Sequence, residues 1–274
     1  MKITGKTRIT GLYGYPVEHT LSPSMHNAAF EHLGIDYCYL PFSVHPDSLK
    51  NAVEAIRALN LAGVNITIPH KESVISYLDH VNEEALFIGA VNTIVNQERE
   101  LTGYNTDGRG FMRSLLENNI IADNKKVLIV GAGGASRAIG YYLSEKADKM
   151  YLFDIDKIKL EKLASDLSGI RGNIHVLKDT ADLSSFDLLI NATPLGLKAT
   201  DPVPLDVSVL SPDQTVCDLI YKKTPLLSLA AQKGCKTIDG LGMLLWQGVL
   251  AFELWTGASP PVEIMKTALI NGIK

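Results

Sequence analysis

The stretch that most constrains the fold is KVLIVGAGGASRA, residues 126–138. Its apolar run, Val127 to Val130, is typical of a strand buried on both faces. A glycine-rich turn follows, and a helical pattern then runs from Arg137 to Lys146. A strand, a glycine turn and a helix in that order form the phosphate-binding start of a dinucleotide-binding fold.

The glycine motif reads GxGxxS rather than GxGxxG, because Ser136 occupies the third small position. Gly131 allows the tight turn, and Gly133 lets the backbone approach a pyrophosphate. Glycine turns without a ligand are common, so the motif alone leaves both interpretations open. The next apolar run ends at Asp154, 23 residues after Gly131, where an acidic side chain reaches the ribose hydroxyls of a dinucleotide.

Length and composition narrow the possible classes of protein. A chain of 274 residues with 46% hydrophobic and 20% charged residues suggests a globular protein of one or two domains. A net charge of −4 and the lack of a basic run argue against nucleic acid as a partner. Cys38, Cys217 and Cys235 are scattered without CxxC spacing, so we expect neither a disulfide framework nor a metal site. Without a signal-peptide pattern or a long apolar stretch, we expect a cytoplasmic protein with no membrane partner.

Polar residues gather at predicted element boundaries in the first half of the chain. The loop GYPVEHTLSP carries His19, Thr20 and Ser22 between two prolines. Ser22 before Pro23 also predicts an N-cap for a helix over 24–33, and the sequence leaves capping alone as an alternative role.

The stretch VNITIPHK predicts a strand with Asn65 and Thr67 on one face. A buried strand face rarely carries Asn and Thr unless something polar lies over it. We expect Pro69 to open a helix and to place Lys71 at the carboxyl end of the strand, where ligands of α/β proteins bind. A lone lysine in such a position is more often solvated surface, but the two polar neighbours favour a function.

Three further polar residues have both a structural and a functional interpretation. Asn92 lies at the entry of a predicted strand, and Asp107 starts a helix after Asn105 and Thr106. A capping cluster explains Asp107 without any ligand. Gln247 interrupts the apolar helix predicted over 243–255, so its amide is bonded in a core or faces a ligand.

The second half of the chain alternates strands with helices, which predicts a parallel sheet with helices on both faces. The predicted elements are 127–131, 134–146, 150–154, 157–167, 174–177, 187–190, 215–220 and 237–239.

With these pieces in order, the chain resembles the shikimate dehydrogenase family over nearly its whole length. The matching stretches are GYPVEHTLSPSMHN, NITIPHK, GAVNT, GYNTDGRG, GAGGASRA, NATPLG and GLGMLLWQG. By that resemblance Lys71 and Asp107 are the catalytic pair. The implied substrate ligands are Thr20, Ser22, Asn65, Thr67, Asn92, Asp107, Tyr221 and Gln247. The implied cofactor-binding residues are Glu83, Gly131, Gly133, Gly134, Ala135, Asp154, Thr193, Leu219, Gly240 and Met243.

The resemblance implies an α/β fold with two domains and an active-site cleft between them. Residues 1–107 with 243–274 would form the substrate-binding domain, and residues 108–242 a Rossmann-like nicotinamide domain. The implied reaction is the reversible reduction of 3-dehydroshikimate to shikimate, in the chorismate pathway to aromatic amino acids. Lys71 would act as acid and base and Asp107 would orient it. The oligomeric state, monomer or homodimer, stays open.

Three departures from the family pattern bear on specificity. Thr20 stands where serine is usual, and its methyl group narrows the pocket for shikimate or the related quinate. The loop after Tyr221 is about two residues shorter than usual, which makes the role of Tyr221 less secure. Asp154-Ile155-Asp156 replaces the Asn-Arg-Thr run of NADP-using members. A carboxylate repels the 2′-phosphate, so we expect NAD to be favoured over NADP, although Lys157 and Lys159 offer the phosphate an alternative partner.

Other functions remain as alternatives at this stage. The nearest is a quinate/shikimate dehydrogenase that prefers NAD and works in the catabolic direction. A dinucleotide-binding regulator would have no reason to keep Lys71 and Asp107 together. A Rossmann enzyme acting on amino acids or folates would not be expected to carry the HTLSP loop.

Overall fold

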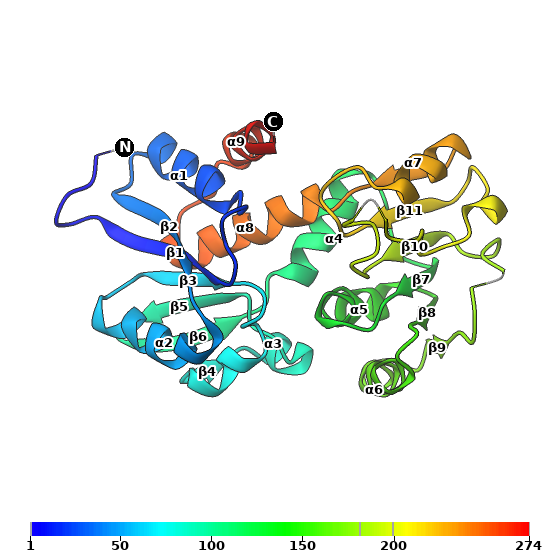
Figure 1. Ribbon diagram of the computed structural model, residues 1–274, viewed down its shortest axis with the longest axis horizontal. Coiled ribbons are helices and arrows are strands. Elements are labelled where there is room, and N and C mark those ends of the chain that lie inside the picture. Colours follow the sequence, from blue (N-terminus) through cyan, green and yellow to red (C-terminus); the bar gives the residue numbers. More distant parts are fainter. Residues whose placement is uncertain (1, 181, 199, 274) are drawn as a thin grey trace. The chain divides into compact units, whose positions relative to one another are not determined.

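The computed structural model describes residues 2–180, 182–198 and 200–273. The chain divides into two units, which Figure 1 follows from the N-terminus in blue to the C-terminus in red. Unit 1 comprises Met1–Thr106 and Leu245–Lys274, and unit 2 comprises Asp107–Leu244. Unit 1 is therefore built from both ends of the chain.

Unit 1 contains a mixed six-stranded sheet in the order β2-β1-β3-β5-β6-β4. β1 runs parallel to both β2 and β3, whereas β5 is antiparallel to both β3 and β6. The strands are β1 (Arg8–Gly14), β2 (Tyr37–Ser43), β3 (Gly63–Ile66), β4 (His80–Val81), β5 (Thr93–Gln97) and β6 (Glu100–Tyr104). The register sets Asn65 of β3 opposite Thr93 of β5, which brings two polar residues together in the sheet.

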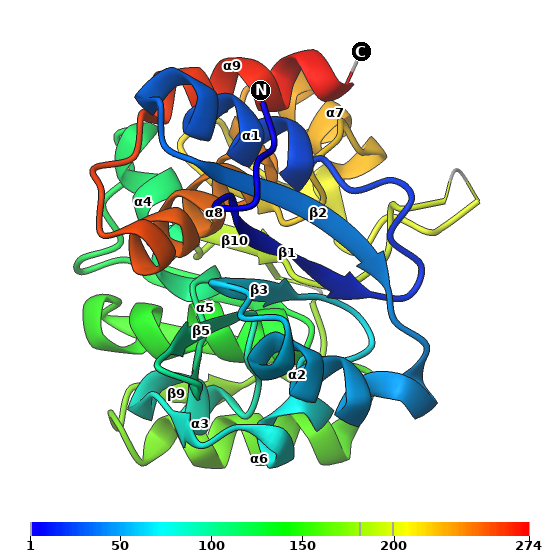
Figure 2. The same cartoon turned by 90° about the vertical axis from the view of Figure 1, so that its left-hand side faces the viewer.

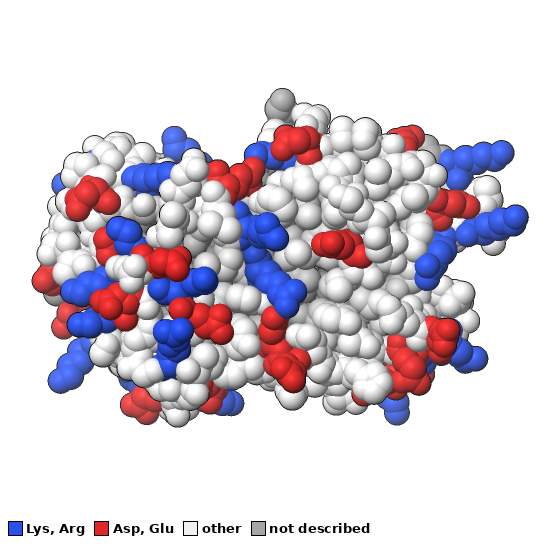
Figure 3. Space-filling view, turned by 180° about the vertical axis from the view of Figure 1, so that it is seen from behind, with Lys and Arg blue, Asp and Glu red and all other residues white. Residues whose placement is uncertain are grey.

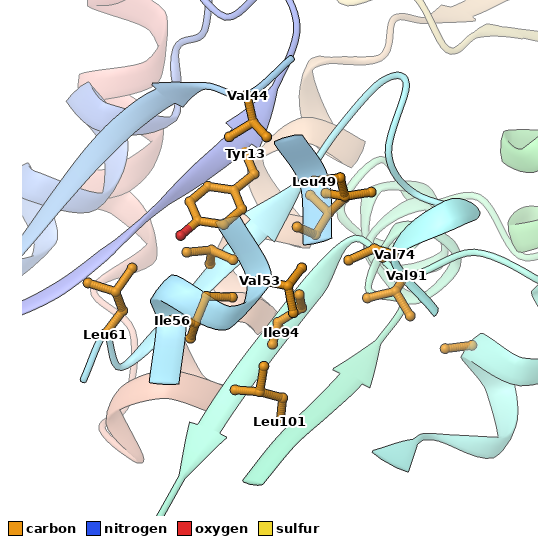
Figure 4. Close-up of a cluster of buried hydrophobic side chains, with 13 residues drawn as sticks. Tyr13, Val44, Leu49, Val53, Ile56, Leu61, Val74, Val91, Ile94 and Leu101 are labelled. Atoms are coloured by element: carbon orange, nitrogen blue, oxygen red, sulfur yellow. The ribbon is translucent and has the colours of Figure 1, made fainter. Parts of the chain in front are cut away.

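Helices cover both faces of this sheet. They are α1 (Ser22–Leu33), α2 (Leu49–Ala58), α3 (Glu83–Ile88), α9 (Val262–Ile273) and the part of α8 (Leu241–Thr256) from Leu245 onward, with short 3-10 segments η1 (Pro46–Ser48) and η2 (Ser73–Tyr77). Figure 2 shows α1 and α9 side by side on one face and α2 on the other. Val53 and Ile56 of α2 belong to one buried cluster with Val64 and Ile94 of the strands. Figure 4 shows Val53, Ile56 and Ile94 side by side in this cluster. The apolar spacing of α2 therefore covers the sheet as the sequence indicates.

Two local predictions for unit 1 are wrong. Ser22 is the first residue of α1 rather than its N-cap, which is Leu21 without a side-chain cap hydrogen bond. Pro69 opens no helix: β3 ends at Ile66, and the N–H of His70 bonds to the carbonyl of Thr67 in a turn that precedes η2. A hydrogen bond three residues back closes a turn instead of starting an α-helix, for which a bond four residues back is required.

Unit 2 contains a six-stranded sheet in the order β12-β11-β10-β7-β8-β9, with every pair parallel. The strands are β7 (Lys126–Val130), β8 (Lys149–Phe153), β9 (Ile174–Val176), β10 (Leu188–Asn191), β11 (Thr215–Asp218) and β12 (Lys236–Ile238). Its helices are α4 (Asp107–Glu117), α5 (Gly134–Lys146), α6 (Lys157–Ser168) and α7 (Pro225–Gln232), with a 3-10 segment η3 (Val207–Val209).

The strand order of unit 2 reverses between β7 and β10, because the chain first moves outward to β8 and β9 and then returns. Ligands of open parallel sheets bind outside the carboxyl ends of the strands at such a reversal. The α/β class predicted from the sequence is confirmed, with a Rossmann-like parallel sheet in unit 2.

Charged side chains of both signs are interspersed on the face drawn in Figure 3, without a large patch of one sign. Cys38, Cys217 and Cys235 are buried free thiols. Within the described ranges, no helix combines the length and the apolar character needed to cross a membrane.

Candidate active site

Buried amides and hydroxyls of unit 1 form one hydrogen-bond network, which we call the amide network. Its members are Tyr39, Asn65, Asn92, Thr93, Thr106 and the backbone carbonyl of Gln247. Asn65 Nδ2 donates to the carbonyl of Asn92 at 3.1 Å and to Thr93 Oγ1 at 3.0 Å. Thr93 Oγ1 in turn donates to Asn92 Oδ1 at 3.0 Å. Asn65 and Asn92 are 5% and 2% exposed, so both amides are held rigidly.

The amide network continues into the turn after β6 and into α8. Asn92 Nδ2 donates to Thr106 Oγ1 at 2.9 Å, and Asn92 Oδ1 accepts from the Thr106 N–H at 2.9 Å. Thr106 Oγ1 donates to the carbonyl of Gln247 at 3.0 Å. The network therefore joins the segments that carry Asn92 and Gln247 and fixes the residue directly before Asp107, the first residue of α4.

The backbone of Lys71 is tied to the same region. Its carbonyl accepts a hydrogen bond from the Val91 N–H at 2.8 Å, and Val91 directly precedes Asn92. The Thr67 N–H donates to the carbonyl of Tyr13 at 2.9 Å. β3 ends at Ile66, and Lys71 follows in the turn just beyond the carboxyl end of that strand. Its side chain is half-buried there.

The loop before α1 reaches the amide network through Tyr39. The Ser22 N–H donates to Thr20 Oγ1 at 3.3 Å, and the Ser22 side chain hydrogen-bonds the Tyr39 hydroxyl. Tyr39 Oη donates to Asn65 Oδ1 at 2.9 Å. Burial raises the pKa of Tyr39 far above its ordinary value, so the phenol stays protonated and remains a donor.

Sequence reasoning missed three members of this network as site residues. Thr93 and Thr106 follow Asn92 and Asn105 directly, so the clusters NT and NTD were a usable signal. Tyr39 lies in an apolar strand, and nothing in its local sequence distinguishes it from a core aromatic.

In unit 2 the turn after β7 has the geometry that the glycine motif predicts. Gly131 has φ +111°, which a side chain rarely tolerates, and a Cβ there would meet the Ala192 backbone at 3.0 Å. Its N–H donates to the carbonyl of Phe153 at 2.8 Å. Ser136 is fully buried, as expected for the position where α5 packs against its strand.

At Gly133 and Gly134 the fit to a cofactor's pyrophosphate rests on open space rather than on backbone conformation. Both are exposed, neither has a positive φ, and a Cβ at either would meet no atom within 4 Å. Nothing within the described chain therefore requires glycine at these positions. They begin α5, whose N-cap provides no side-chain hydrogen bond, so its first N–H groups face outward with the positive end of the helix dipole. Both features are those that a phosphate-binding helix start requires.

Asp154 follows β8 and ties the turn together. Its Oδ2 accepts from the Ala132 N–H at 2.6 Å, and its Oδ1 accepts from the Asp156 N–H at 2.8 Å. Each carboxylate oxygen keeps a second lone pair for a ribose hydroxyl. Asp154 therefore shapes the glycine turn in addition to the ribose-binding role that the sequence predicts.

The two lysines offered as phosphate partners are engaged locally. Lys157 Nζ donates to the Asp154 carbonyl at 3.1 Å and lies 5.1 Å from the centre of the Phe153 ring. Lys159 Nζ pairs with Asp156 at 3.2 Å. Ile155, at the position where NADP-using members carry arginine, is 88% exposed.

The remaining predicted residues fall in both units. Thr193, Leu219, Gly240 and Met243 lie in unit 2 in the segments after β10, β11 and β12. Tyr221 follows β11 and is 41% exposed. Glu83, by contrast, is an exposed residue at the start of α3 in unit 1. No group of His, Cys, Asp and Glu side chains among the described residues could hold a metal ion.

Comparison with known proteins decides the family. Residues 12–94 match the model of the shikimate dehydrogenase substrate binding domain, and residues 240–270 match the shikimate 5′-dehydrogenase C-terminal domain. A shikimate dehydrogenase (NADP(+)) of Carboxydothermus hydrogenoformans is 45% identical over 98% of this chain and 99% of its own length. The chain belongs to the shikimate dehydrogenase family. It is accordingly an NAD(P)-dependent oxidoreductase, which confirms the resemblance and the enzyme class inferred from the sequence.

Solved shikimate dehydrogenase structures share the whole fold. One in complex with NADP⁺ superposes with a TM-score of 0.94 at 39% identity, covering 100% of this chain and 98% of that one. The enzyme of Listeria monocytogenes in complex with shikimate and NAD gives 0.89 at 38% identity, covering 97% and 98%. A quinate dehydrogenase from Corynebacterium glutamicum in complex with NAD gives 0.90 at 33% identity, covering 97% and 99%.

Proposed function

We propose that this chain catalyses the reversible reduction of 3-dehydroshikimate to shikimate, with Lys71 as acid and base and Asp107 as the group that orients it. The observation that carries the proposal is the amide network, whose buried amides and hydroxyls lie along the segments that hold Lys71, Asp107 and Gln247. A polyol acid needs many fixed hydrogen-bonding groups. A site built to bond a hydroxyl discriminates by ~10⁴-fold against an analogue that lacks it.

The reaction needs a hydride on the carbonyl carbon and a proton on its oxygen. The bound nicotinamide supplies the hydride. The Lys71 ammonium hydrogen-bonds the carbonyl oxygen, stabilises the negative charge that develops there and donates the proton. In the oxidative direction neutral Lys71 accepts the proton of the hydroxyl. Thr20, Ser22, Asn65, Thr67, Asn92, Tyr221 and Gln247 hold the remaining hydroxyls and the carboxylate of the substrate.

For the cofactor we propose a preference for NAD, or weak discrimination between NAD and NADP. Ile155 offers no positive charge to a 2′-phosphate, and Asp154 and Asp156 flank it with carboxylates. Lys157 and Lys159 are held by Asp154 and Asp156, so recruiting them would break existing contacts. Two free ribose hydroxyls suit the Asp154 carboxylate better than a phosphate does.

The test is a set of initial rates for the oxidation of shikimate and quinate, each with NAD and with NADP. We expect shikimate to be the better substrate and NAD to give a catalytic efficiency at least equal to that with NADP. Quinate oxidation as efficient as shikimate oxidation would favour the catabolic alternative. An efficiency with NADP well above that with NAD would overturn the cofactor proposal and leave the substrate proposal intact. We also propose a cytoplasmic location, as expected for an enzyme using this cofactor pool.

A further inference from the structure

A buried carboxylate that the mechanism does not use lies at the carboxyl end of β11. Asp218 is the last residue of that strand and is 1% exposed. It therefore lies at the carboxyl ends of the parallel strands, which is where ligands of such sheets bind. Burial, together with the charge of Asp239, raises the pKa of Asp218, while its hydrogen bonds oppose that rise. A buried acid of this kind is retained only where its partners stabilise it.

Three donors converge on the Asp218 carboxylate. Oδ1 accepts from Asn191 Nδ2 at 3.0 Å and from the Ile220 N–H at 3.1 Å. Oδ2 accepts from Thr224 Oγ1 at 2.7 Å. Asn191 and Thr224 are 0% and 2% exposed, so the whole arrangement is buried. The carboxylate thus joins the end of β10, the turn after β11 and the start of α7.

Through Asn191 the carboxylate fixes the segment that carries Thr193. Asn191 Oδ1 accepts from both the N–H and the hydroxyl of Thr193, at 3.1 and 2.6 Å. Asn191 Nδ2 also donates to the carbonyl of Leu195 at 3.1 Å. Because an amide cannot rotate without exchanging its oxygen and nitrogen, the bond to Asp218 determines which atom Asn191 presents to Thr193.

Through Ile220 the Asp218 carboxylate also fixes the segment that carries Gly240. The carbonyl of Ile220 accepts from the Gly240 N–H at 3.0 Å. A Cβ at Gly240 would lie 2.1 Å from the carbonyl oxygen of Leu219, so the two backbones are in direct contact. Leu219 and Tyr221 flank Ile220 on either side in the chain.

We propose that Asp218 is a positioning residue for the nicotinamide end of the cofactor, holding the loops that carry Thr193, Leu219 and Gly240 in one fixed arrangement. The proposal rests on the proposed function for the assignment of those loops to the cofactor. The adenosine end is held by different segments, the turn after β7 and Asp154 after β8. Loss of Asp218 therefore affects one end of the dinucleotide and spares the other.

The experiment compares binding of NAD and ADP by calorimetry in the wild type, Asp218→Ala and Asp218→Asn, together with steady-state rates. ADP probes only the adenosine and phosphate end. For Asp218→Ala we expect kcat/KM with varied NAD to fall about 10- to 100-fold, with NAD binding weakened and ADP binding unchanged. Asp218→Asn keeps an oxygen for Asn191 and Ile220, so it shows a smaller loss of the same kind.

Gln214→Ala is the matched control, because Gln214 lies at the opposite end of β11 from Asp218. Gln214 directly precedes β11, is 2% exposed and bonds the carbonyls of Leu183 and Phe186 at 2.7 Å. We expect this variant to lower the melting temperature while leaving the NAD-to-ADP affinity ratio at the wild-type value.

An equal loss of NAD and ADP binding, or no loss of either, in a folded Asp218 variant would overturn the proposal. If Asp218→Ala does not fold, Asp218→Asn alone decides by the same ratio. The outcome is separate from the proposed reaction, because calorimetry needs no substrate. A wild type inactive on shikimate would sink the proposed function and leave this measurement standing.

Discussion

The residues proposed to bind ligands are arranged in different ways in the two units. Unit 1 uses buried side chains, since Asn65, Asn92 and Thr106 bond one another in the amide network. Unit 2 uses backbone, since Gly133 and Gly134 leave open space before the uncapped start of α5. The difference fits the ligands that we propose for the two units. A polyol acid is recognised by groups of fixed direction, whereas a pyrophosphate needs close approach to N–H groups and a helix dipole.

This contrast predicts different consequences of mutation. Removing a member of the amide network costs stability as well as binding, because its partners stay buried and unsatisfied. Filling the open space beside the glycine turn with a side chain weakens cofactor binding without lowering the stability of the fold.

Lys71→Ala tests the chemical step in unit 1. We expect kcat for shikimate oxidation to fall about 10²- to 10⁴-fold, the usual contribution of a positioned acid and base. The variant should still fold, because the hydrogen bond of the Lys71 carbonyl is made by backbone and is retained. A kcat within a factor of about 10 of the wild type would remove Lys71 from the mechanism.

Asn92→Ala tests the amide network. We expect a loss of about 1–3 kcal/mol in the free energy of unfolding, from unsatisfied partners, together with a raised KM for shikimate. Asn96→Ala is the matched control in β5, where Asn96 is 6% exposed and donates to the carbonyl of Leu61 at 2.8 Å. It should lose similar stability in denaturant titrations with an unchanged KM. If both variants raise KM equally, the network has no special relation to substrate.

Gly133→Val tests the open backbone of unit 2. Its φ of −85° and ψ of −173° suit any residue, so the melting temperature should not change. We expect the KM for the cofactor to rise about 10-fold, because the side chain blocks the approach of a pyrophosphate. Gly131→Ala in the same turn should instead destabilise the protein, since φ there is +111°. A cofactor KM unchanged in Gly133→Val would argue against binding at this turn.

His26 of unit 1 and Asp218 of unit 2 are both buried titratable groups, but they differ in their hydrogen bonds. Asp218 has three donors, whereas neither ring nitrogen of His26 has a hydrogen-bond partner among the described residues. The His26 ring stacks on that of Tyr39, with 4.5 Å between the ring centroids. Burial lowers the pKa of His26 to about 3. The unfolded chain, with a histidine pKa of about 6.5, binds the proton more readily. Stability from this group is therefore present above about pH 6.5 and lost as pH falls towards 3, by up to about 1.4 kcal/mol per pH unit.

His26→Phe should reduce that acid sensitivity, as measured by denaturant titration at pH 7 and at pH 5.5. If the free energy of unfolding of His26→Phe depends on pH as it does in the wild type, other groups cause the loss of stability at acidic pH.

Local sequence patterns were enough to predict the α/β class, the strand–turn–helix of residues 126–146 and the family. Asn65 on a predicted buried strand face and Gln247 in an apolar helix were also recognised as unusual for their surroundings. These inferences succeed because they rest on local patterns, namely apolar runs, glycine spacing and motif order. The local predictions that failed, the cap at Ser22 and the helix at Pro69, involve short polar loops whose hydrogen bonds depend on distant partners.

The hydrogen bonds that join the polar residues could not be predicted from the sequence, because they follow from the strand order. The mixed strand order of unit 1 sets β3 beside β5, and so brings Asn65 to Asn92 and Thr93. Tyr39 enters the same network from β2, and Asp218 connects three segments of unit 2. Such contacts depend on strand register and sheet order, which follow from burial summed over the whole core rather than from any one stretch of sequence.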